Sequence, residues 1–529
     1  MMKRNLFKIL VLGGVSMIAV SCGGGGGGGQ SDTSKPAGDD STSAPSTGSS
    51  SQANTSTSGG GSATSKVEIS FWHTFGQTIQ DNLNPQIEAF EKLIKDNEGV
   101  DVEVKLTPYS DYATINSDIN TKLKTNDIPT IAVAYPDHIA DYLLFEGDTP
   151  GKYIVDFNDY INDSKVGLGK EAFLGDAKDD SIDDFIPAYL EGGRSFSRQG
   201  QLCLPYMKST EAMLYNYDAV VKVLAHYKPE FQGAENKIKN YMENLDWAEF
   251  MNLCKETAKY KNEINPALEQ VAYYDSDANL FISQLYQSNI PYASIVENQG
   301  KKGGHVDFES GAARTNAEKM VKSLKNYYDD RSEGVRLFST KGTQGGYGSN
   351  SFKNIESVFV IGSTGGSGYS LTSTFKIGVC KVPPVVANNP LYVTQGPELC
   401  IFNNPSLSQT ANSKRTLYAW KLIKYLTNSE NNCKICLQGS EGYLPVRQSS
   451  YEEDLYLDFL DSGIQQADIA NVVTDTIDGH FLNTPCFAGS TDLRTACGSL
   501  LTDCLLTDSV DKISGIFQTA IDNAIRMFK

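Results

Sequence analysis

The apolar positions of the first folded stretch alternate between the periods of strands and helices. Residues 67–72 alternate as a strand does, and residues 100–106 do so again. Between them, five apolar residues recur at helical spacing: Ile79, Leu83, Ile87, Phe90 and Ile94. A helical segment over 112–124 follows, and then an apolar run over 129–134 that suits a central parallel strand. This order predicts an α/β domain with a parallel sheet, in which ligands meet the carboxyl ends of the strands.

The stretch from Leu204 to Asp218 places a polar turn directly against a core strand. Pro205 blocks helix continuation, Ser209 and Thr210 follow, and residues 212–215 read as a short buried strand. Loops that are anchored on scaffold strands commonly hold binding groups, so the two hydroxyl residues are candidate ligand contacts. An ordinary loop that enters a strand is the alternative interpretation.

A second polar turn follows the apolar strand pattern at residues 358–361. Glycines in this turn permit close backbone approach, so its amides and Ser363 or Thr364 suit an anion or hydroxyl groups. The turn lacks the Gly-Lys-Ser/Thr of a P-loop and the Gly-x-Gly-x-x-Gly spacing of dinucleotide sites. A nucleotide is therefore not the expected ligand.

Aromatic residues mark the ends of two strands of the first predicted sheet. Trp72 ends one strand and Tyr135 follows another, and each has a histidine nearby, His73 or His138. An aromatic face for C–H groups together with polar tips for hydroxyls suits a sugar or polyol. Packed strand termini are the alternative for all four residues.

Composition and charge narrow the class of partner. The chain has 529 residues, enough for two or more domains, and its 40% hydrophobic content is ordinary for a globular protein. Its formal net charge is −18. Nucleic acid is therefore not an expected partner, because phosphate binding depends on basic patches that release counterions.

The first 65 residues read as a leader and a tether. Residues 1–21 have a basic start and an apolar middle that is short for a membrane span, which is typical of a secretory signal peptide. The sequence Ala-Val-Ser-Cys22 resembles a bacterial lipobox, so Cys22 is the expected lipidation site, with a simple secreted cysteine as the alternative. Residues 22–65 are almost wholly Gly, Ser, Thr and similar residues, which predicts a disordered tether.

Neither the cysteines nor the acidic loops predict a metal or cofactor. Cys433 and Cys436 form a lone CxxC in a helical pattern, without a second pair or histidines for zinc, so a structural role is favoured over a redox role. The Asp-rich segment 275–286 starts like a calcium loop. It has Leu280 where glycine is needed and Tyr286 where a bidentate glutamate is needed. The pairing of the other cysteines stays open.

Taken together, these stretches resemble the extracellular solute-binding proteins of ABC importers, in the family 1 branch for sugars and glycerol 3-phosphate. The resemblance covers about residues 67–528, and its motifs occur in the family's order. They are Phe71-Trp-His73, Leu204-Pro-Tyr with Leu-Tyr-Asn-Tyr-Asp218, Trp247-Ala-Glu-Phe250, Ile361-Gly-Ser-Thr-Gly-Gly366, Gln395-Gly396 and Gly442-Tyr-Leu-Pro-Val-Arg447.

The resemblance implies a two-lobed periplasmic-binding-protein fold of type II, α/β throughout, in which several hinge crossovers join the lobes. Lobe 1 would comprise residues 66–207 plus 378–437, and lobe 2 would comprise residues 208–376 plus 438–529. The crossovers would lie near Lys208, Lys376 and Leu437, where a few residues absorb closure.

The resemblance also implies a set of ligand-binding residues and no catalytic ones. The expected contacts are Trp72, Tyr135, Ser209, Thr210, Tyr274, Ser363, Thr364, Gly396, Tyr443 and Arg447. Tyr274 lies where phosphate-binding relatives have tryptophans, so glycerol 3-phosphate itself is not the expected ligand. Arg447 has two readings, an ion pair with a phosphate or hydrogen bonds to backbone carbonyls.

The implied function is capture of a carbohydrate or polyol, or of a glycerophosphate-type ligand, and its delivery to ABC permease subunits without chemical change. We expect a monomer without cofactor, held by its lipid on the extracytoplasmic face of a bacterial membrane, periplasmic or at the cell surface. A secreted glycan-active hydrolase and a surface adhesin or sensor are the alternatives. No Gly-x-Ser-x-Gly, His-Glu-x-x-His or motif-placed carboxylate pair supports the hydrolase.

Overall fold

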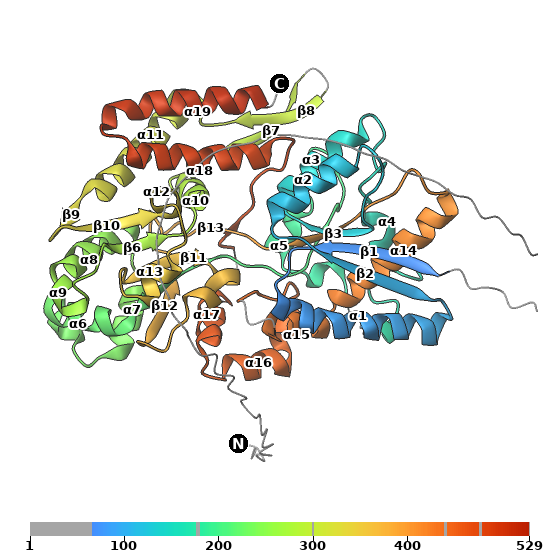
Figure 1. Cartoon of the computed structure of the whole chain (residues 1–529), viewed down its shortest axis with the longest axis horizontal. Coiled ribbons are helices and arrows are strands. Elements are labelled where there is room, and N and C mark those ends of the chain that lie inside the picture. The colour runs from blue at the N-terminus through green and yellow to red at the C-terminus, as the bar shows by residue number, and fades with distance from the viewer. Residues whose placement is uncertain (1–65, 176–179, 299–300, 439–441, 475–478, 528–529) are drawn as a thin grey trace, which may run out of the picture. The chain divides into compact units, whose positions relative to one another are not determined.

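Two large β-sheets organise the part of the chain that the computed structural model describes. That part comprises residues 66–175, 180–298, 301–438, 442–474 and 479–527. The predicted leader, Cys22 and the predicted tether lie outside it. The mixed α/β architecture with two sheets confirms the predicted fold class (Figure 1).

The first sheet has the strand order β2-β1-β3-β14-β4. These strands are β1 (Val67–His73), β2 (Val102–Pro108), β3 (Ile131–Ala134), β4 (Leu204–Pro205) and β14 (Glu398–Ile401). β1 runs parallel to β2 and β3, whereas β14 runs antiparallel to β3 and β4. The predicted succession of strand, helix, strand, helix and strand is therefore confirmed.

Four helices pack around this sheet: α1 (Gln77–Glu98), α2 (Tyr112–Lys122), α3 (Pro136–Leu143) and α14 (Gln409–Leu426). Figure 1 shows α1 on one side of the strands and α2 and α3 on the other. The five apolar residues at helical spacing in α1 are all buried in the core of this sheet. The helix ends where Gly99 takes the left-handed conformation, with φ 69°.

The second sheet has the strand order β12-β5-β11-β6-β10-β9. These strands are β5 (Glu211–Asn216), β6 (Gln270–Tyr274), β9 (Arg331–Ser332), β10 (Val335–Thr340), β11 (Phe359–Ser363) and β12 (Ile377–Lys381). β6 runs parallel to β10 and β11, and β5 runs antiparallel to β11 and β12. This sheet has its own hydrophobic core.

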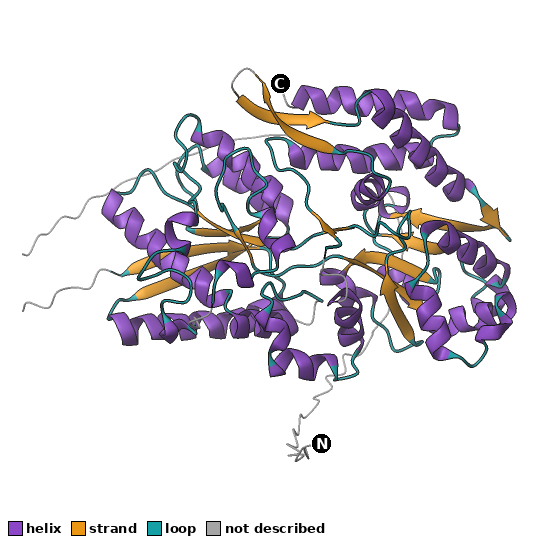
Figure 2. Cartoon of the chain, turned by 180° about the vertical axis from the view of Figure 1, so that it is seen from behind, coloured by secondary structure: helices purple, strands orange, loops and turns teal. Residues whose placement is uncertain are grey.

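Helices surround the second sheet as well, and the last two are long. The main ones are α6 (Tyr217–Tyr227), α8 (Trp247–Lys259), α10 (Asp277–Gln287), α11 (Gly311–Asp329), α18 (Ser490–Leu506) and α19 (Ile513–Met527). α18 and α19 run side by side in both views (Figure 1; Figure 2), and α18 also packs against α10. The last helix of the chain thus covers α18 rather than the sheet.

The remaining elements are short or peripheral. The helices are α4 (Asn158–Ile161), α5 (Pro187–Gly192), α7 (Glu235–Glu243), α9 (Lys261–Ile264), α12 (Lys341–Gln344), α13 (Ser349–Lys353), α15 (Ser429–Gln438), α16 (Asp454–Leu460) and α17 (Gln465–Thr474). Two strand pairs stand apart from the large sheets: β7 (Ala293–Asn298) with β8 (Lys301–Val306), and β13 (Tyr392–Val393) with β15 (Phe481–Leu482). The 3-10 helical turns are η1 (Leu144–Glu146), η2 (Ala172–Leu174), η3 (Ile182–Asp184), η4 (Pro229–Phe231), η5 (Thr364–Ser370), η6 (Ser449–Glu452) and η7 (Val510–Lys512). No helix of the described ranges combines the length and the apolar character that a membrane crossing requires.

The chain passes between the two sheets through segments that hydrogen-bond to one another. Lys208 and Leu444 exchange backbone hydrogen bonds of 3.1 and 2.7 Å, and Ser209 and Gln395 exchange bonds of 3.0 and 2.8 Å. The crossing expected near Lys376 comes later in the chain, because β12 pairs with β5 in the second sheet. Residues 377–381 therefore lie with the second sheet, where the predicted boundary had assigned 378 onward to lobe 1.

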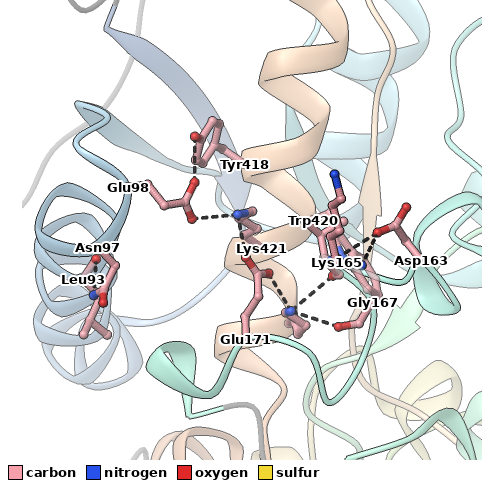
Figure 3. A network of polar contacts seen from close by, with 12 residues as sticks. Leu93, Asn97, Glu98, Asp163, Lys165, Gly167, Glu171, Tyr418, Trp420 and Lys421 are labelled. Carbon is pink, nitrogen blue, oxygen red and sulfur yellow. Dashed lines mark hydrogen bonds and ion pairs between the residues drawn. The ribbon is translucent and has the colours of Figure 1, made fainter.

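A buried network of charges ties α14 to the loop around residue 171. Figure 3 shows Lys421 between Glu98 and Glu171, with nitrogen–oxygen distances of 2.7 and 2.6 Å. Lys424 contacts the second carboxylate oxygen of Glu171 at 2.7 Å and is itself fully buried. Because these charges have left water, each depends on its partners, and loss of one carboxylate leaves a buried cation short of an acceptor.

We predict that Glu171→Gln lowers the free energy of unfolding by about 3 kcal/mol, because the neutral amide no longer compensates Lys421 and Lys424. Urea denaturation followed by circular dichroism measures the change. Lys92→Met is the control, since Lys92 forms a largely exposed ion pair with Asp96 on α1. A Glu171→Gln midpoint equal to that of the control would contradict the prediction.

Candidate functional site

A cavity of about 930 Å³ is lined by residues from both sheets and from the crossing segments. Four strands deliver lining residues at their carboxyl ends: Tyr135 follows β3, Asp275 follows β6, Lys341 follows β10 and Ser363 ends β11. The cavity therefore lies where the parallel pattern of the sequence predicted a ligand site.

Tyrosine rings make up most of the aromatic lining of the cavity within the described residues. Five tyrosines within the described ranges line it: Tyr112, Tyr135, Tyr292, Tyr347 and Tyr369. The Tyr112 and Tyr135 ring centroids lie 4.3 Å apart with a tilt of 38°. Tyr347 and Tyr369 are 63% and 73% exposed, so their rings stand open at the rim. Tyrosine offers both an apolar face and a hydroxyl, which suits a ligand with C–H and O–H groups.

Lys208 lines the cavity next to the crossing and belongs to a buried ion pair. Lys208 Nζ pairs with Glu398 Oε1, and their side chains are only 3% and 0% exposed. Burial raises the pKa of the Glu398 carboxyl, and the ammonium group of Lys208 opposes that rise. A buried pair of this kind costs desolvation free energy, so it is weak evidence for stability and stronger evidence for a role in the cavity.

A second polar chain runs from β5 through α10 to α18. Glu211 accepts hydrogen bonds from the Tyr274 hydroxyl at 2.5 Å and from Asn279 Nδ2 at 2.8 Å. Arg494 donates to Asn279 Oδ1. Burial raises the pKa of Glu211 from 4.5 to about 7, against the lowering effect of the hydrogen bonds from Tyr274 and Asn279 and of the charge on Arg494.

Asp275 and Lys341 lie on the same side of the cavity, after β6 and β10. Asp275 accepts the Gly348 backbone N–H at 2.7 Å, and burial raises its pKa to about 6. Lys341 Nζ lies 3.7 Å from the centroid of the Tyr347 ring. One face of that ring is thus covered by a cation.

Three of the ten predicted contacts line the cavity: Tyr135, Ser363 and Gly396. At Gly396 φ is 99°, and an added Cβ would lie 2.2 Å from the Met207 carbonyl oxygen, so only glycine fits this close approach. The other seven residues lie outside the lining: Trp72, Ser209, Thr210, Tyr274, Thr364, Tyr443 and Arg447. Whether any of the ten contacts a ligand stays a prediction.

Several of these seven support the lining from behind. Ser363 donates to the Ser209 hydroxyl oxygen at 3.3 Å, and Thr210 donates to the Val393 carbonyl at 3.1 Å. Thr364 Oγ1 accepts the Thr210 N–H at 3.3 Å. Tyr274 holds Glu211 in place. The stretch from Leu204 to Asp218 thus reaches the cavity mainly through Lys208 and Glu211, on either side of the two hydroxyl residues.

Trp72 and Arg447 are used for packing and for backbone hydrogen bonds. Trp72 is buried against Tyr109, with ring centroids 5.2 Å apart. Arg447 is fully buried, donates to the carbonyls of Thr427 and Ser181, and pairs with Asp184 at 3.2 Å. Of the two roles expected for Arg447, the structure shows hydrogen bonds to backbone carbonyls.

The histidines near the strand ends differ in their surroundings. His138 lines the cavity, and burial lowers its pKa. His73 stays outside the lining and accepts the Phe75 N–H, and burial lowers its pKa to about 4. Both rings are therefore neutral at neutral pH.

Sequence reasoning missed several lining residues: Lys208, Asn279, Arg494 and four of the tyrosines. Tyr369 was within reach, because it ends the glycine-rich turn that was already singled out. Arg494 carries no local signal, since it meets Asn279 across 215 positions of sequence.

Comparisons with known proteins give a family and a fold. A family model described as bacterial extracellular solute-binding protein matches residues 86–458. Comparison with the curated proteins gives no match.

Many solved structures share the fold at low sequence identity. The cyclic α-maltosyl-1,6-maltose binding protein of Arthrobacter globiformis is 15% identical, with 87% of this chain and 99% of that chain covered and a TM-score of 0.60. UgpB from Mycobacterium tuberculosis, in complex with glycerophosphocholine, is 18% identical, with 87% of this chain and 98% of that chain covered and a TM-score of 0.59. An ABC substrate-binding protein of Listeria monocytogenes, in complex with cycloalternan, is 14% identical, with 87% of this chain and 98% of that chain covered and a TM-score of 0.61.

We predict that Glu211 makes the protein less stable as pH rises from about 4.5 to about 7. In this window the folded state holds a proton that the unfolded state has released, so the free energy of unfolding falls with pH, by up to about 3 kcal/mol for this group. Glu211→Gln removes the titration but keeps an acceptor for Tyr274 or Asn279. Urea denaturation at pH 4.5, 6 and 7.5 should show a shallower fall for the variant, and parallel curves for the two proteins would disprove the assignment.

Proposed function

This chain belongs to the family of bacterial extracellular solute-binding proteins, and on that premise we propose that it captures a carbohydrate or polyol and delivers it to an ABC permease. Membership also means that the protein acts outside the cytoplasm on a small solute. The single observation that carries the ligand class is the cavity of about 930 Å³, whose walls combine tyrosine rings with hydroxyl and amide groups. The size lies at the upper end of the range for small-molecule sites, which suits a ligand of more than one sugar ring.

The lining groups match the surface of a sugar. Tyr112 and Tyr135 present a tilted pair of aromatic rings, and Tyr347 and Tyr369 present exposed rings at the rim. Hydroxyl and amide side chains between them supply donors and acceptors: Asn116, Ser117, Asn279, Ser363, Thr394, Gln395, Asn483 and Thr491. Aromatic faces bind C–H groups while these polar tips bind hydroxyls. Relatives of known structure bind maltosyl sugars, cycloalternan or glycerophosphocholine, which agrees with this class.

Capture would work by closure of the two lobes on the ligand. The Tyr112 and Tyr135 pair belongs to the side of the first sheet, whereas Tyr347 and Tyr369 belong to the side of the second. A ligand that contacts both groups binds the closed state better than the open state, and this difference in affinity shifts the population toward closure. The closed form would then be the one that the permease accepts.

A glycan-active hydrolase is the second candidate, because Glu211 and Asp275 line the cavity with pKa values raised to about 7 and about 6. Raised carboxyl pKa values are a feature of catalytic acids. Both oxygens of Glu211 already accept hydrogen bonds from Tyr274 and Asn279, which favours a structural use. A surface adhesin or sensor is the remaining alternative, and it differs from an importer by having no permease to supply.

The binding experiment is isothermal titration calorimetry against a panel of mono- and oligosaccharides, polyols and glycerophosphodiesters. We predict saturable binding to one class, and about 3- to 10-fold weaker binding for Tyr135→Ala and for Tyr347→Ala, because each removes one ring contact. Leu144→Ala, an exposed apolar residue outside the cavity lining, is the matched control.

Three outcomes would decide against the proposal. Binding of no sugar, polyol or glycerophosphodiester would exclude the ligand class. Chromatographic detection of cleavage products would favour the hydrolase. Failure of the purified protein to support uptake in proteoliposomes by an ABC permease encoded beside its gene would favour the adhesin or sensor.

We also propose that residues 1–21 are a signal peptide and that Cys22 carries a lipid that includes palmitate. This lipid would tether the monomeric protein to the membrane. We predict that wild-type protein, expressed in a bacterial host, incorporates a clickable palmitate analogue and enters the detergent phase of a Triton X-114 extraction. Cys22→Ser should lose the label and enter the aqueous phase. Equal labelling of both forms would place the lipid on another residue, and absence of the label from both forms would exclude it. Cys254→Ser, at a buried cysteine of α8, controls for removal of any thiol.

A further inference from the structure

Arg494 is a cation of the cavity wall that no carboxylate neutralises. It lines the cavity and donates to Asn279 Oδ1, and no carboxylate of the described residues lies within ion-pair distance of it. Asn279 is itself held from its other end by Glu211. This hydrogen bond positions the guanidinium, whose other N–H donors have no acceptor among the described residues.

The carboxylates that line the cavity are engaged elsewhere. Glu211 accepts from Tyr274 and Asn279, and Asp275 accepts from Gly348. Asp137 accepts the His138 N–H at 3.2 Å and lies in the first turn of α3, where the positive end of the helix offsets its charge. Lys208 already has Glu398 as its counter-ion. The remaining cation of the lining, Lys341, lies 3.7 Å from the centroid of the Tyr347 ring. Arg494 is instead held by its hydrogen bond to Asn279, and this makes it the cation best placed to receive a negative charge from the ligand.

Two further polar atoms of residues that line the cavity have no hydrogen-bond partner among the described residues. Thr491 lies one helical turn before Arg494 on α18, lines the cavity, and its buried Oγ1 has no hydrogen-bond partner among the described residues. His138 is 5% exposed, lines the cavity from α3, and its Nδ1 is likewise unpartnered. α3 and α18 are in contact, and the Gly489 N–H donates to Asp141 at 3.2 Å where the two helices meet. Unsatisfied buried polar atoms are rare and call for a partner.

We infer that the ligand carries an oxyanion and that Arg494 binds it, with Thr491 and His138 as additional hydrogen-bonding groups. The inference rests on the proposed function and narrows the ligand to an acidic carbohydrate or polyol. A planar guanidinium matches carboxylate, sulfate and phosphate alike, so the three share one recognition chemistry. Because α3 and α18 belong to different lobes, the same anion would also favour closure.

Matched pairs of ligands test the inference and separate the three sources of charge. The pairs are digalacturonate and its methyl ester, glucose 6-sulfate and glucose, and glucose 6-phosphate and glucose, each titrated by calorimetry. We expect the acidic member of at least one pair to bind on the order of 10- to 100-fold more tightly than its neutral partner. Its affinity should fall as salt is added.

Variants then assign the effect to Arg494. Arg494→Gln should remove most of the preference for the acidic member, and Arg494→Lys should keep part of it. Arg526→Gln on α19 changes the net charge equally at an exposed position and should leave the preference intact. The ratio of the two affinities is the readout, since a purely structural defect would weaken both members together.

Each negative result has a distinct meaning. Binding of neutral carbohydrates alone, here or in the wider panel, would overturn the inference and leave the proposed function standing. An acidic preference that survives Arg494→Gln would also overturn it. Binding of no carbohydrate or polyol at all would remove the proposed function and the inference together.

Discussion

The crossing segments are hydrogen-bonded to one another, and this constraint shapes the rest of the molecule. Lys208 pairs through its backbone with Leu444, and Ser209 pairs with Gln395, so at least three segments of chain form one ribbon between the sheets. A ribbon of this kind resists stretching and sliding but permits rotation, because hinge motion needs only a few changed torsion angles. Gly396 shows how tightly the strands approach, since any side chain there would meet the Met207 carbonyl. Lys208, Gln395 and Gly396 of this ribbon line the cavity, so the hydrogen bonds of the crossing also hold part of the cavity wall.

Charges at this ribbon cost stability and are retained next to the cavity. Lys208 and Glu398 are both withdrawn from water, and Glu398 Oε2 has no hydrogen-bond partner in the described part of the chain. An apolar pair of the same volume would cost less. The network of Glu98, Glu171 and Lys421 is better satisfied, because each oxygen of Glu171 faces an ammonium group. The network therefore compensates its buried charges more fully than the pair of Lys208 and Glu398 does.

Local patterns predicted the elements well, and contacts between distant segments were beyond them. In β1 and α1 the buried face is set by the order of apolar and polar residues within a few consecutive positions, so the sequence pattern alone identifies each element. The pairing of β12 with β5 depends on which strand it meets in space, so the boundary near residue 378 could not be read from the pattern. Arg447 follows a family motif, but only its surroundings distinguish a phosphate contact from the buried carbonyls that it binds. Arg494 and Asn279 are adjacent only in the folded chain.

The aromatic rings that line the cavity come from the sides of both sheets. Trp72, Trp247 and Trp420 are all buried in the cores, so ring contacts with a ligand fall to tyrosines. The Tyr112 and Tyr135 rings contact each other, and this contact uses part of the aromatic surface on the first lobe. On the second lobe, Lys341 covers one face of Tyr347, and the open faces of Tyr347 and Tyr369 stand in water. On the proposed function, a sugar would gain ring contacts from both sides, so most of the aromatic contact free energy would become available only when the lobes approach. Affinity and closure would then be coupled, and a ligand too short to reach both groups of tyrosines would bind without closing the protein.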